Sequence, residues 1–284
     1  MRKEIRQVYV GERALFASKD LHLVECIFDD GESPLKESSN IVVDNSMFKW
    51  KYPLWYCNDV VVNDCTLFET ARAGMWYTNN ITFNNCIIEA PKSFRKSSKI
   101  TLNNVSIPNA AETLFNCSDV TLRDVYAQGT YFAMNCKNIL CENLTLIGDY
   151  CFDGAENLTI RNSKLLSKDS FWNCKNVTVY DSFISGEYLA WNSENVTFVN
   201  CTIESLQGLC YVKNLKLVGC RLINTTRAFE YCTVDADIIG KVDSVVNPTS
   251  GRIVADGFDS VTLDDKYVDP TKTEIVVRNG KRVQ

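Results

Sequence analysis

The chain contains a single histidine, so a serine or cysteine nucleophile that needs a histidine base would have to use His22. His22 stands between Leu21 and Leu23, in an alternating pattern that places its side chain on the outside of a strand. This position indicates an incidental surface histidine more than a catalytic base. Glycine-rich phosphate loops and cysteine or histidine pairs with zinc spacing are missing from the sequence. We therefore predict no metal and no cofactor, and the sequence assigns no catalytic residue.

Aromatic residues recur at one position of a repeated pattern. Four of the five tryptophans, Trp55, Trp76, Trp172 and Trp191, directly follow a buried apolar position, in a column that also holds charged residues. The charged members predict that this column faces water. Exposed aromatic surface along a rigid face suits sugar rings, although such rings also pack against each other or form subunit contacts. We expect a carbohydrate-like ligand on this face, with a self-associating scaffold, such as a homodimer, as the alternative.

Charged residues flank the aromatic column. Lysine and arginine side chains beside Trp55 and Trp76 are expected to contact anionic groups of the ligand. Asp149 and Asp153 share one repeat and could form an acid pair or a calcium site, or lie solvated beside Lys168. A lyase-like or hydrolase-like enzyme acting on a polysaccharide is a second alternative. The predicted ligand-binding residues are Glu32, Lys36, Lys51, Trp55, Arg72, Trp76, Arg95, Asp149, Asp153, Trp172 and Trp191.

The elements that must position these residues come from a repeat. The first apolar residue of each unit recurs eleven times, from Leu21 to Leu215, at a nearly constant spacing. A short repeat of constant period is the signature of a solenoid. Apolar residues alternate after each such position, an Asn, Asp or Gly usually follows as a turn residue, and two further apolar positions come next. Each unit therefore predicts three short strands separated by turns.

Three strands per unit predict an all-β fold, a parallel β-helix of about eleven coils of 19–21 residues, each stacked on the next. A leucine-rich-repeat solenoid is the alternative, because FWNCKNVTVYDS (171–182) has a similar rhythm. The β-helix is preferred, because the apolar pair after the turn needs a strand of its own. We predict one domain, 1–284, with a lead-in at 1–19, coils at 20–232 and a C-terminal cap at 233–284.

Three segments, ERALF (12–16), GESPLKES (31–38) and FKWKYPLWYC (48–57), resemble a bacterial family known only as a domain of unknown function. Its members are single-domain right-handed β-helices, distantly similar to pectate lyases in fold. The resemblance covers most of the chain and implies a right-handed parallel β-helix solenoid. It implies no catalytic residues, because the family offers none to transfer.

Composition bounds the partners and the location. A net charge of −5 argues against nucleic acid and anionic membranes as partners, and there is no apolar run of about 18 residues that could span a membrane. The charged start MRKEIRQVYVGERALF lacks the apolar stretch of a signal peptide, which predicts a cytoplasmic protein. Thirteen cysteines recur at repeat positions and indicate reduced structural thiols. The N-x-T triplets, such as those at Asn176 and Asn195, are interpreted as turn asparagines before strand threonines.

Overall fold

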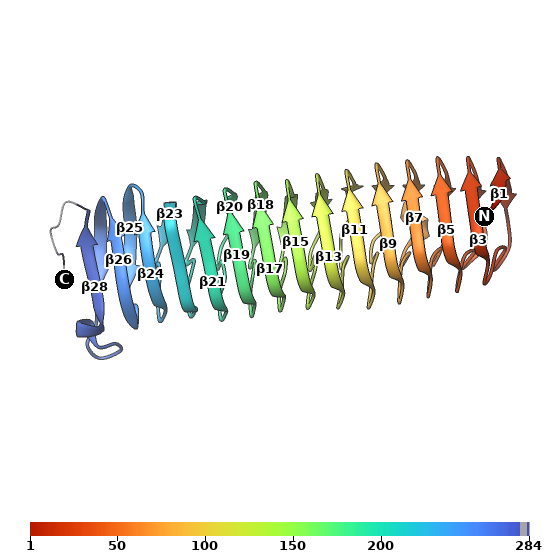
Figure 1. Cartoon of the computed structure of the whole chain (residues 1–284). Coiled ribbons are helices and arrows are strands. Elements are labelled where there is room, and N and C mark those ends of the chain that lie inside the picture. Colours follow the sequence, from red (N-terminus) through yellow and green to blue (C-terminus); the bar gives the residue numbers. More distant parts are fainter. Residues whose placement is uncertain (279–282, 284) are drawn as a thin grey trace. The chain divides into compact units, whose positions relative to one another are not determined.

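The computed structural model describes residues 1–278 and 283. It divides into two compact units, Met1–Ile147 and Gly148–Gln284, which are called unit 1 and unit 2. Each unit consists of stacked coils of parallel strands (Figure 1). The helical segments in the described residues are two short 3-10 turns, η1 (Glu69–Ala71) and η2 (Pro270–Lys272). The all-β parallel β-helix prediction is confirmed, and the leucine-rich-repeat alternative is wrong.

In unit 1, each coil contributes one strand to a first sheet. Neighbouring strands pair in parallel, so that Leu21 lies beside Ile41 and Ile41 beside Val60. All three side chains are at most 1% exposed. Alternate residues point outward, because successive side chains of a strand face opposite sides. The strands are β1 (Arg2–Ile5), β3 (Lys19–Val24), β5 (Ser39–Asp44), β7 (Asn58–Asn63), β9 (Asn79–Asn84), β11 (Ser98–Asn103), β13 (Ser118–Arg123) and β15 (Lys137–Glu142).

A tight turn leads from each of these strands to a second sheet. The turn residue predicted as Asn, Asp or Gly has a positive φ in every coil from Glu25 to Gly219, between 48° and 61°. Short polar residues and glycine tolerate this left-handed conformation best. The second-sheet strands that begin in unit 1 are β2 (Val8–Tyr9), β4 (Ile27–Phe28), β6 (Met47–Phe48), β8 (Thr66–Leu67), β10 (Ile87–Ile88), β12 (Ser106–Ile107), β14 (Tyr126–Gln128) and β16 (Thr145–Asp149).

Unit 2 repeats the arrangement with longer second-sheet strands. Its first sheet contains β17 (Glu156–Arg161), β19 (Lys175–Tyr180), β21 (Glu194–Val199), β23 (Lys213–Thr226), β24 (Thr233–Ile238), β26 (Ser250–Ala255) and β28 (Thr273–Val277). The second-sheet side contains β18 (Lys164–Lys168), β20 (Phe183–Ser185) and β22 (Thr202–Leu206), which pairs with the second half of β23. β25 (Lys241–Val246) and β27 (Gly257–Thr262) pair with each other.

The predicted third strand is wrong for most coils. The third apolar column is buried as expected, for example at Leu54 and Phe94, yet the chain forms a turn at Leu54 and irregular backbone at Phe94. Closely spaced left-handed residues, such as Tyr52 and Tyr56, interrupt the extended backbone. In the described residues of unit 1 the isolated bridges on this side join Trp76 to Arg95 and Arg95 to Phe115, and in unit 2 one joins Ala228 to Val245. This side of each coil is called the third face.

The described residues contain more coils than the eleven that the period predicted. β1 lies in the expected lead-in, and β24, β26 and β28 lie in the expected cap. β1 could not be predicted from the repeat, because Arg2 and Glu4 occupy positions that are apolar in other coils. β26 and β28 were missed because the repeat shortens between Ala236 and Ile253 and lengthens from there to Ile275. β24 keeps the regular spacing, since Val234 pairs with Leu215. The single-domain boundaries stay a prediction.

Candidate functional site

The aromatic column of unit 1 forms a ladder on the third face. The rings of Trp55 and Trp76 are stacked, with centroids 5.2 Å apart and planes 8° apart. The guanidinium of Arg95 lies 4.8 Å from the centroid of Trp76 and 4.7 Å from that of Phe115. The ring of Tyr52 also contacts Trp55, with centroids 4.6 Å apart and planes tilted by 42°. Both tryptophan rings therefore contact neighbouring side chains of the protein.

The polar atoms of these tryptophans are also engaged. The indole N–H of Trp55 donates to the carbonyl oxygen of Ala73 at 2.5 Å, and that of Trp76 donates to the carbonyl oxygen of Lys92 at 2.8 Å. Both bonds reach the next coil, so they fix the ring planes in the stacked orientation. A sugar ring stacks on an open aromatic face, whereas this ladder presents mainly ring edges. Its geometry suits packing between coils better than ligand stacking.

The predicted charges of unit 1 are largely paired within the protein. Lys51 lies 3.1 Å from Glu32, and Arg95 lies 2.8 Å from Glu112, a residue that the sequence did not single out. Burial alone would raise the pKa of Glu112, but hydrogen bonds and charges from Lys92 and Arg95 outweigh this effect and lower it.

Two other predicted cations differ in their surroundings. The Lys36 ammonium lies 3.8 Å from Glu37, and Arg72 is exposed. Arg72 is therefore the predicted cation of unit 1 that faces solvent most openly.

The third face of unit 2 has its own tryptophan pair. Trp172 and Trp191 are stacked at 5.9 Å, and their indole N–H groups donate to the carbonyl oxygens of Tyr188 and Gln207. Asp153 accepts a hydrogen bond from the Asn173 amide at 2.9 Å, and Asp149 is exposed. In the part of the chain that the structure describes, no three His, Cys, Asp or Glu side chains gather as metal ligands.

One carboxyl of unit 2 escaped the sequence prediction. Asp169 is 2% exposed, and burial raises its pKa, with further contributions from the neighbouring Asp149 and Glu187. Lys168 and Tyr150 act in the opposite direction on the same carboxyl. Its position beside the Lys168–Glu187 ion pair, which measures 3.2 Å, makes it a structural carboxyl of the third face.

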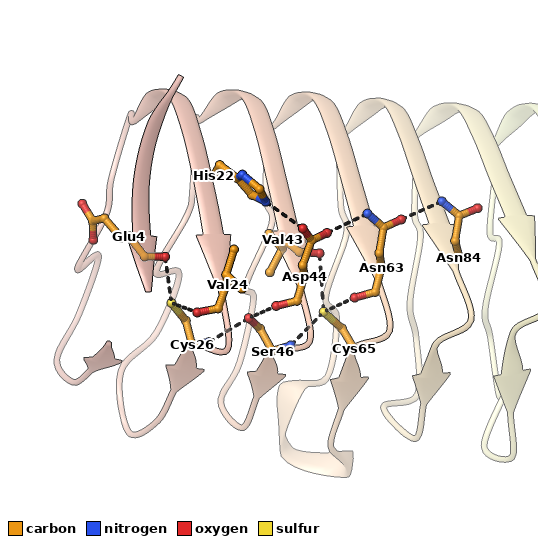
Figure 2. Close-up of polar contacts among 10 residues, drawn as sticks. All are labelled: Glu4, His22, Val24, Cys26, Val43, Asp44, Ser46, Asn63, Cys65 and Asn84. Carbon is orange, nitrogen blue, oxygen red and sulfur yellow. Dashed lines mark hydrogen bonds and ion pairs between the residues drawn. The ribbon is translucent and has the colours of Figure 1, made fainter. Parts of the chain in front are cut away.

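His22 has a partner on the outer face of the first sheet in unit 1. Its Nε2 lies 2.6 Å from Asp44 Oδ2 on the neighbouring strand β5 (Figure 2). Burial alone would raise the pKa of Asp44, but hydrogen bonds from Asn63 and His22 lower it. The sequence placed His22 outside its strand correctly and did not find this pairing, because the two residues belong to different coils.

Amide side chains extend this pair into a ladder. Asn63 donates to Asp44 at 2.7 Å, Asn84 donates to Asn63 at 2.8 Å, and Asn103 donates to Asn84 at 2.9 Å (Figure 2 shows the first two of these bonds). All these donors point the same way, and the run ends on the carboxylate of Asp44. The ladder links successive coils from β5 to β11 by side-chain hydrogen bonds, in addition to the backbone bonds.

The cysteines lie inside the coils and contact backbone carbonyls. Cys65 contacts the carbonyl oxygens of Val43 and Asn63, and Ser46, at the same position one coil earlier, bonds to the carbonyl of Asp44 (Figure 2). All thirteen cysteines are buried. Burial raises the pKa of Cys57 to about 12, which keeps its thiol protonated. The prediction of structural rather than reactive thiols fits this geometry.

A groove of about 600 Å³ opens on the outer face of the first sheet in unit 2. Asn176, Asn195 and Asn214 lie along it on successive strands β19, β21 and β23, and each has a left-handed backbone. Thr178 and Thr197 lie two residues further along their strands and point outward, because the residues between them and the asparagines are buried. The triplets that resemble glycosylation signals therefore form the wall of a polar groove.

The groove asparagines form a ladder that leaves some of their hydrogen-bonding positions unused. Asn195 donates to Asn176, and Asn214 donates to Asn195, both at 2.9 Å. A primary amide carries two N–H donors and an oxygen with two lone pairs. The ladder engages one donor of each amide and one lone pair of each accepting oxygen, so the remaining positions can meet a ligand or water. The groove thus offers a row of groups that both donate and accept.

The repeat changes at one end of the groove. Thr233 takes the position of the next asparagine, and its hydroxyl accepts the backbone N–H of Asn214 at 2.7 Å. One strand further, Gly251 has φ +122°, and a Cβ there would lie 1.8 Å from the carbonyl oxygen of Val234. Only glycine permits this close approach. Lys216 and Asp235 are exposed neighbours on β23 and β24, so this end carries one charge of each sign.

These observations define a class: the protein is a parallel β-helix whose outer faces carry side-chain ladders, one rung per coil. More particularly, the chain belongs to the family described as Protein of unknown function (DUF3737), whose model matches residues 3–276. Among curated proteins, none matches the chain. No helix in the described ranges, 1–278 and 283, is long and apolar enough to cross a membrane.

Three solved structures illustrate the likeness of fold. The mannuronan C-5 epimerase AlgE4 A-module of Azotobacter vinelandii is 10% identical over 96% of this chain and 88% of its own, with a TM-score of 0.37. PfbA, a surface adhesin of Streptococcus pneumoniae, is 9% identical over 98% and 85%, with a TM-score of 0.42. HetL, a pentapeptide repeat protein of the cyanobacterium Nostoc sp. strain PCC 7120, is 8% identical over 78% and 92%, with a TM-score of 0.36. At these values the likeness is no guide to chemistry.

Proposed function

We propose that this protein binds a carbohydrate-like, polyhydroxylated ligand in the groove of unit 2. The observation that carries the proposal is the row of Asn176, Asn195 and Asn214 amides beside the Thr178 and Thr197 hydroxyls. Each hydroxyl of a sugar both donates and accepts a hydrogen bond, and these side chains do the same. Neighbouring strands repeat the pattern about every 4.8 Å, which suits a chain-like ligand laid across the strands.

The aromatic face supports this function less well. The rings of Trp55 and Trp76 contact each other and their neighbours, and Lys51 and Arg95 are paired with carboxylates. The third face is therefore the alternative ligand site that the experiments below must distinguish from the groove. Self-association through the same face is the alternative function, favoured by Tyr56 and Tyr77, which are 43% and 38% exposed.

A cytoplasmic location is part of the proposal. It is supported by the thirteen buried cysteine thiols, because thiols persist in a reducing compartment.

A thermal-shift screen with neutral and acidic oligosaccharides, with and without calcium, tests the proposal. A ligand that binds the folded state raises the melting temperature. The groove variant is Thr178→Val/Thr197→Val, and the matched control is Thr82→Val/Thr101→Val, at the equivalent outward positions of β9 and β11 in unit 1.

We expect one oligosaccharide class to shift the wild type and the control equally, and the groove variant much less. The proposal fails if no oligosaccharide shifts the wild type at millimolar concentration, or if the two double variants respond alike.

A further inference from the structure

The first coil differs from every other coil of unit 1 in what it places inside. Arg2, Glu4 and Tyr9 lie in register with Leu21, Leu23 and Phe28 of the second coil. Those three apolar side chains are at most 1% exposed, which shows that the register positions face the interior. In the first coil the same positions thus hold a cation, an anion and a phenol.

The three polar side chains form one connected cluster. Arg2 lies 2.8 Å from Glu4, and the hydroxyl of Tyr9 donates a hydrogen bond to the same carboxylate. The ring of Tyr9 stacks on Phe28 with centroids 5.1 Å apart. Burial, followed by Glu4, raises the pKa of this phenol, so it stays protonated and able to donate. The Tyr9 ring therefore covers the apolar interior, and the charged groups of Arg2 and Glu4 lie on its solvent side.

The edge beside this cluster is otherwise suited to strand addition. β1 pairs with β3 on one side, and no described strand pairs with its other edge. Ile5, Val8 and Val10 of the same coil are 47%, 60% and 66% exposed. An open edge with apolar neighbours is a template for another strand, and inward-pointing charges are one of the devices that block it.

We propose that Arg2, Glu4 and Tyr9 form an end plug, which prevents a second copy of this chain from adding its own β1 edge to β1. A second copy is the relevant partner because its first coil presents the same cross-section and the same open edge, so that a twofold contact would be self-complementary in shape. Such a contact would bury Arg2 and Glu4 away from water, and the desolvation of both charges opposes it. The plug acts independently of any ligand in the groove.

The test replaces the plug with the residues of an ordinary coil, Arg2→Leu/Glu4→Leu/Tyr9→Phe. The matched control is Arg6→Leu/Glu25→Leu, which removes one cation and one anion from an outward ion pair between the first two coils. Both variants keep the net charge. Light scattering after gel filtration gives the mass over a range of concentrations, and hydrogen exchange reports on the β1 amides.

We expect the plug variant to show a concentration-dependent mass near twice that of the wild type, with slower exchange in β1, while the control keeps the wild-type mass. The proposal is overturned if the folded plug variant keeps the wild-type mass and exchange, or if the control associates equally. Should the triple variant fail to fold, Glu4→Leu alone decides, because Tyr9 can still stack on Phe28: partial association supports the plug, and an unchanged mass overturns it.

Discussion

The third face of unit 1 and the groove of unit 2 are both built from side chains repeated once per coil, yet they leave different groups for a ligand. On the third face, Trp76 contacts Trp55 and Arg95 through its ring faces, and its N–H donates to a backbone carbonyl. In the groove, Asn195 bonds to the asparagines on either side and retains a further donor and acceptor site. The two ladders differ in how many hydrogen-bonding and stacking positions of each side chain remain after its contacts with the neighbouring coils are made.

This comparison separates a ladder that stabilises coils from one that can also bind. A tryptophan between two coils has two faces and one N–H, and its neighbours occupy all three. A primary amide has more hydrogen-bonding positions than one ladder needs, so an amide ladder stabilises the stack and still presents polar groups outward. Repetition in the sequence is therefore weak evidence for a binding site until the contacts of each rung are known.

The largest expected effect is a loss of stability on the aromatic ladder. Trp76→Ala removes the contacts with Trp55 and Arg95 and the bond to Lys92, and should lower the free energy of unfolding by about 2–3 kcal/mol. Urea unfolding measures it. Ile87→Ala, which removes an exposed side chain of β10, is the control and should cost less than about 1 kcal/mol. If Trp76→Ala kept normal stability and lost ligand binding, the ligand site would lie on the third face instead of in the groove.

The groove should show the opposite pattern. Thr178→Val/Thr197→Val is expected to weaken oligosaccharide binding at least tenfold, which corresponds to about 1.4 kcal/mol. Its stability should change by less than about 0.5 kcal/mol, because both side chains are at the surface. Titration calorimetry and urea unfolding measure the two quantities. Equal binding by this variant and by Thr82→Val/Thr101→Val would show that the ligand does not bind in the groove.

The smallest effect concerns two carboxyls of the third faces. The folded pKa of Glu112 lies below its ordinary value of 4.5, so its stabilising contribution is present above that pH and is lost as the pH falls through the folded pKa. The folded pKa of Asp169 lies above its ordinary value of 3.8, so its penalty grows as the pH rises from there.

Unfolding of Glu112→Gln and Asp169→Asn between about pH 3 and pH 7 should therefore show opposite trends relative to the wild type. Glu112→Gln should lose stability toward neutral pH, by less than about 1 kcal/mol because Glu112 is partly exposed. Asp169→Asn should gain stability over the same range. Parallel trends would contradict the assignment of the two environments.

The sequence predicted the parts of the fold that depend on period. The apolar columns, the left-handed turn residues from Glu25 to Gly219 and the outward position of Trp55 follow from the nearly constant spacing of the repeat. β1, β26 and β28 were not predicted, because Arg2 and Glu4 break the apolar column and the spacing changes after Ala236. A period reports which side of a strand a residue faces, and it does not report ends at which the pattern changes.

The candidate site was harder to predict for a related reason. The pattern shows that Trp76 faces outward, whereas the direction of its ring depends on the contact with Lys92 one coil away. The groove had a signal in the repeated N-x-T triplets at Asn176 and Asn195, which were interpreted only as turn residues before a strand. Their role emerges from the side chains that surround them on neighbouring strands.

The most direct test of the central claim is a titration followed through the threonine methyl groups by NMR. The protein is labelled at threonine methyls and titrated with the oligosaccharide that gives the largest thermal shift. If the groove binds the ligand, concentration-dependent shifts are expected at Thr178, Thr197 and Thr233, with unchanged signals at Thr82 and Thr101. Unchanged groove threonines, together with a change in tryptophan fluorescence on binding, would contradict it and place the ligand on an aromatic third face.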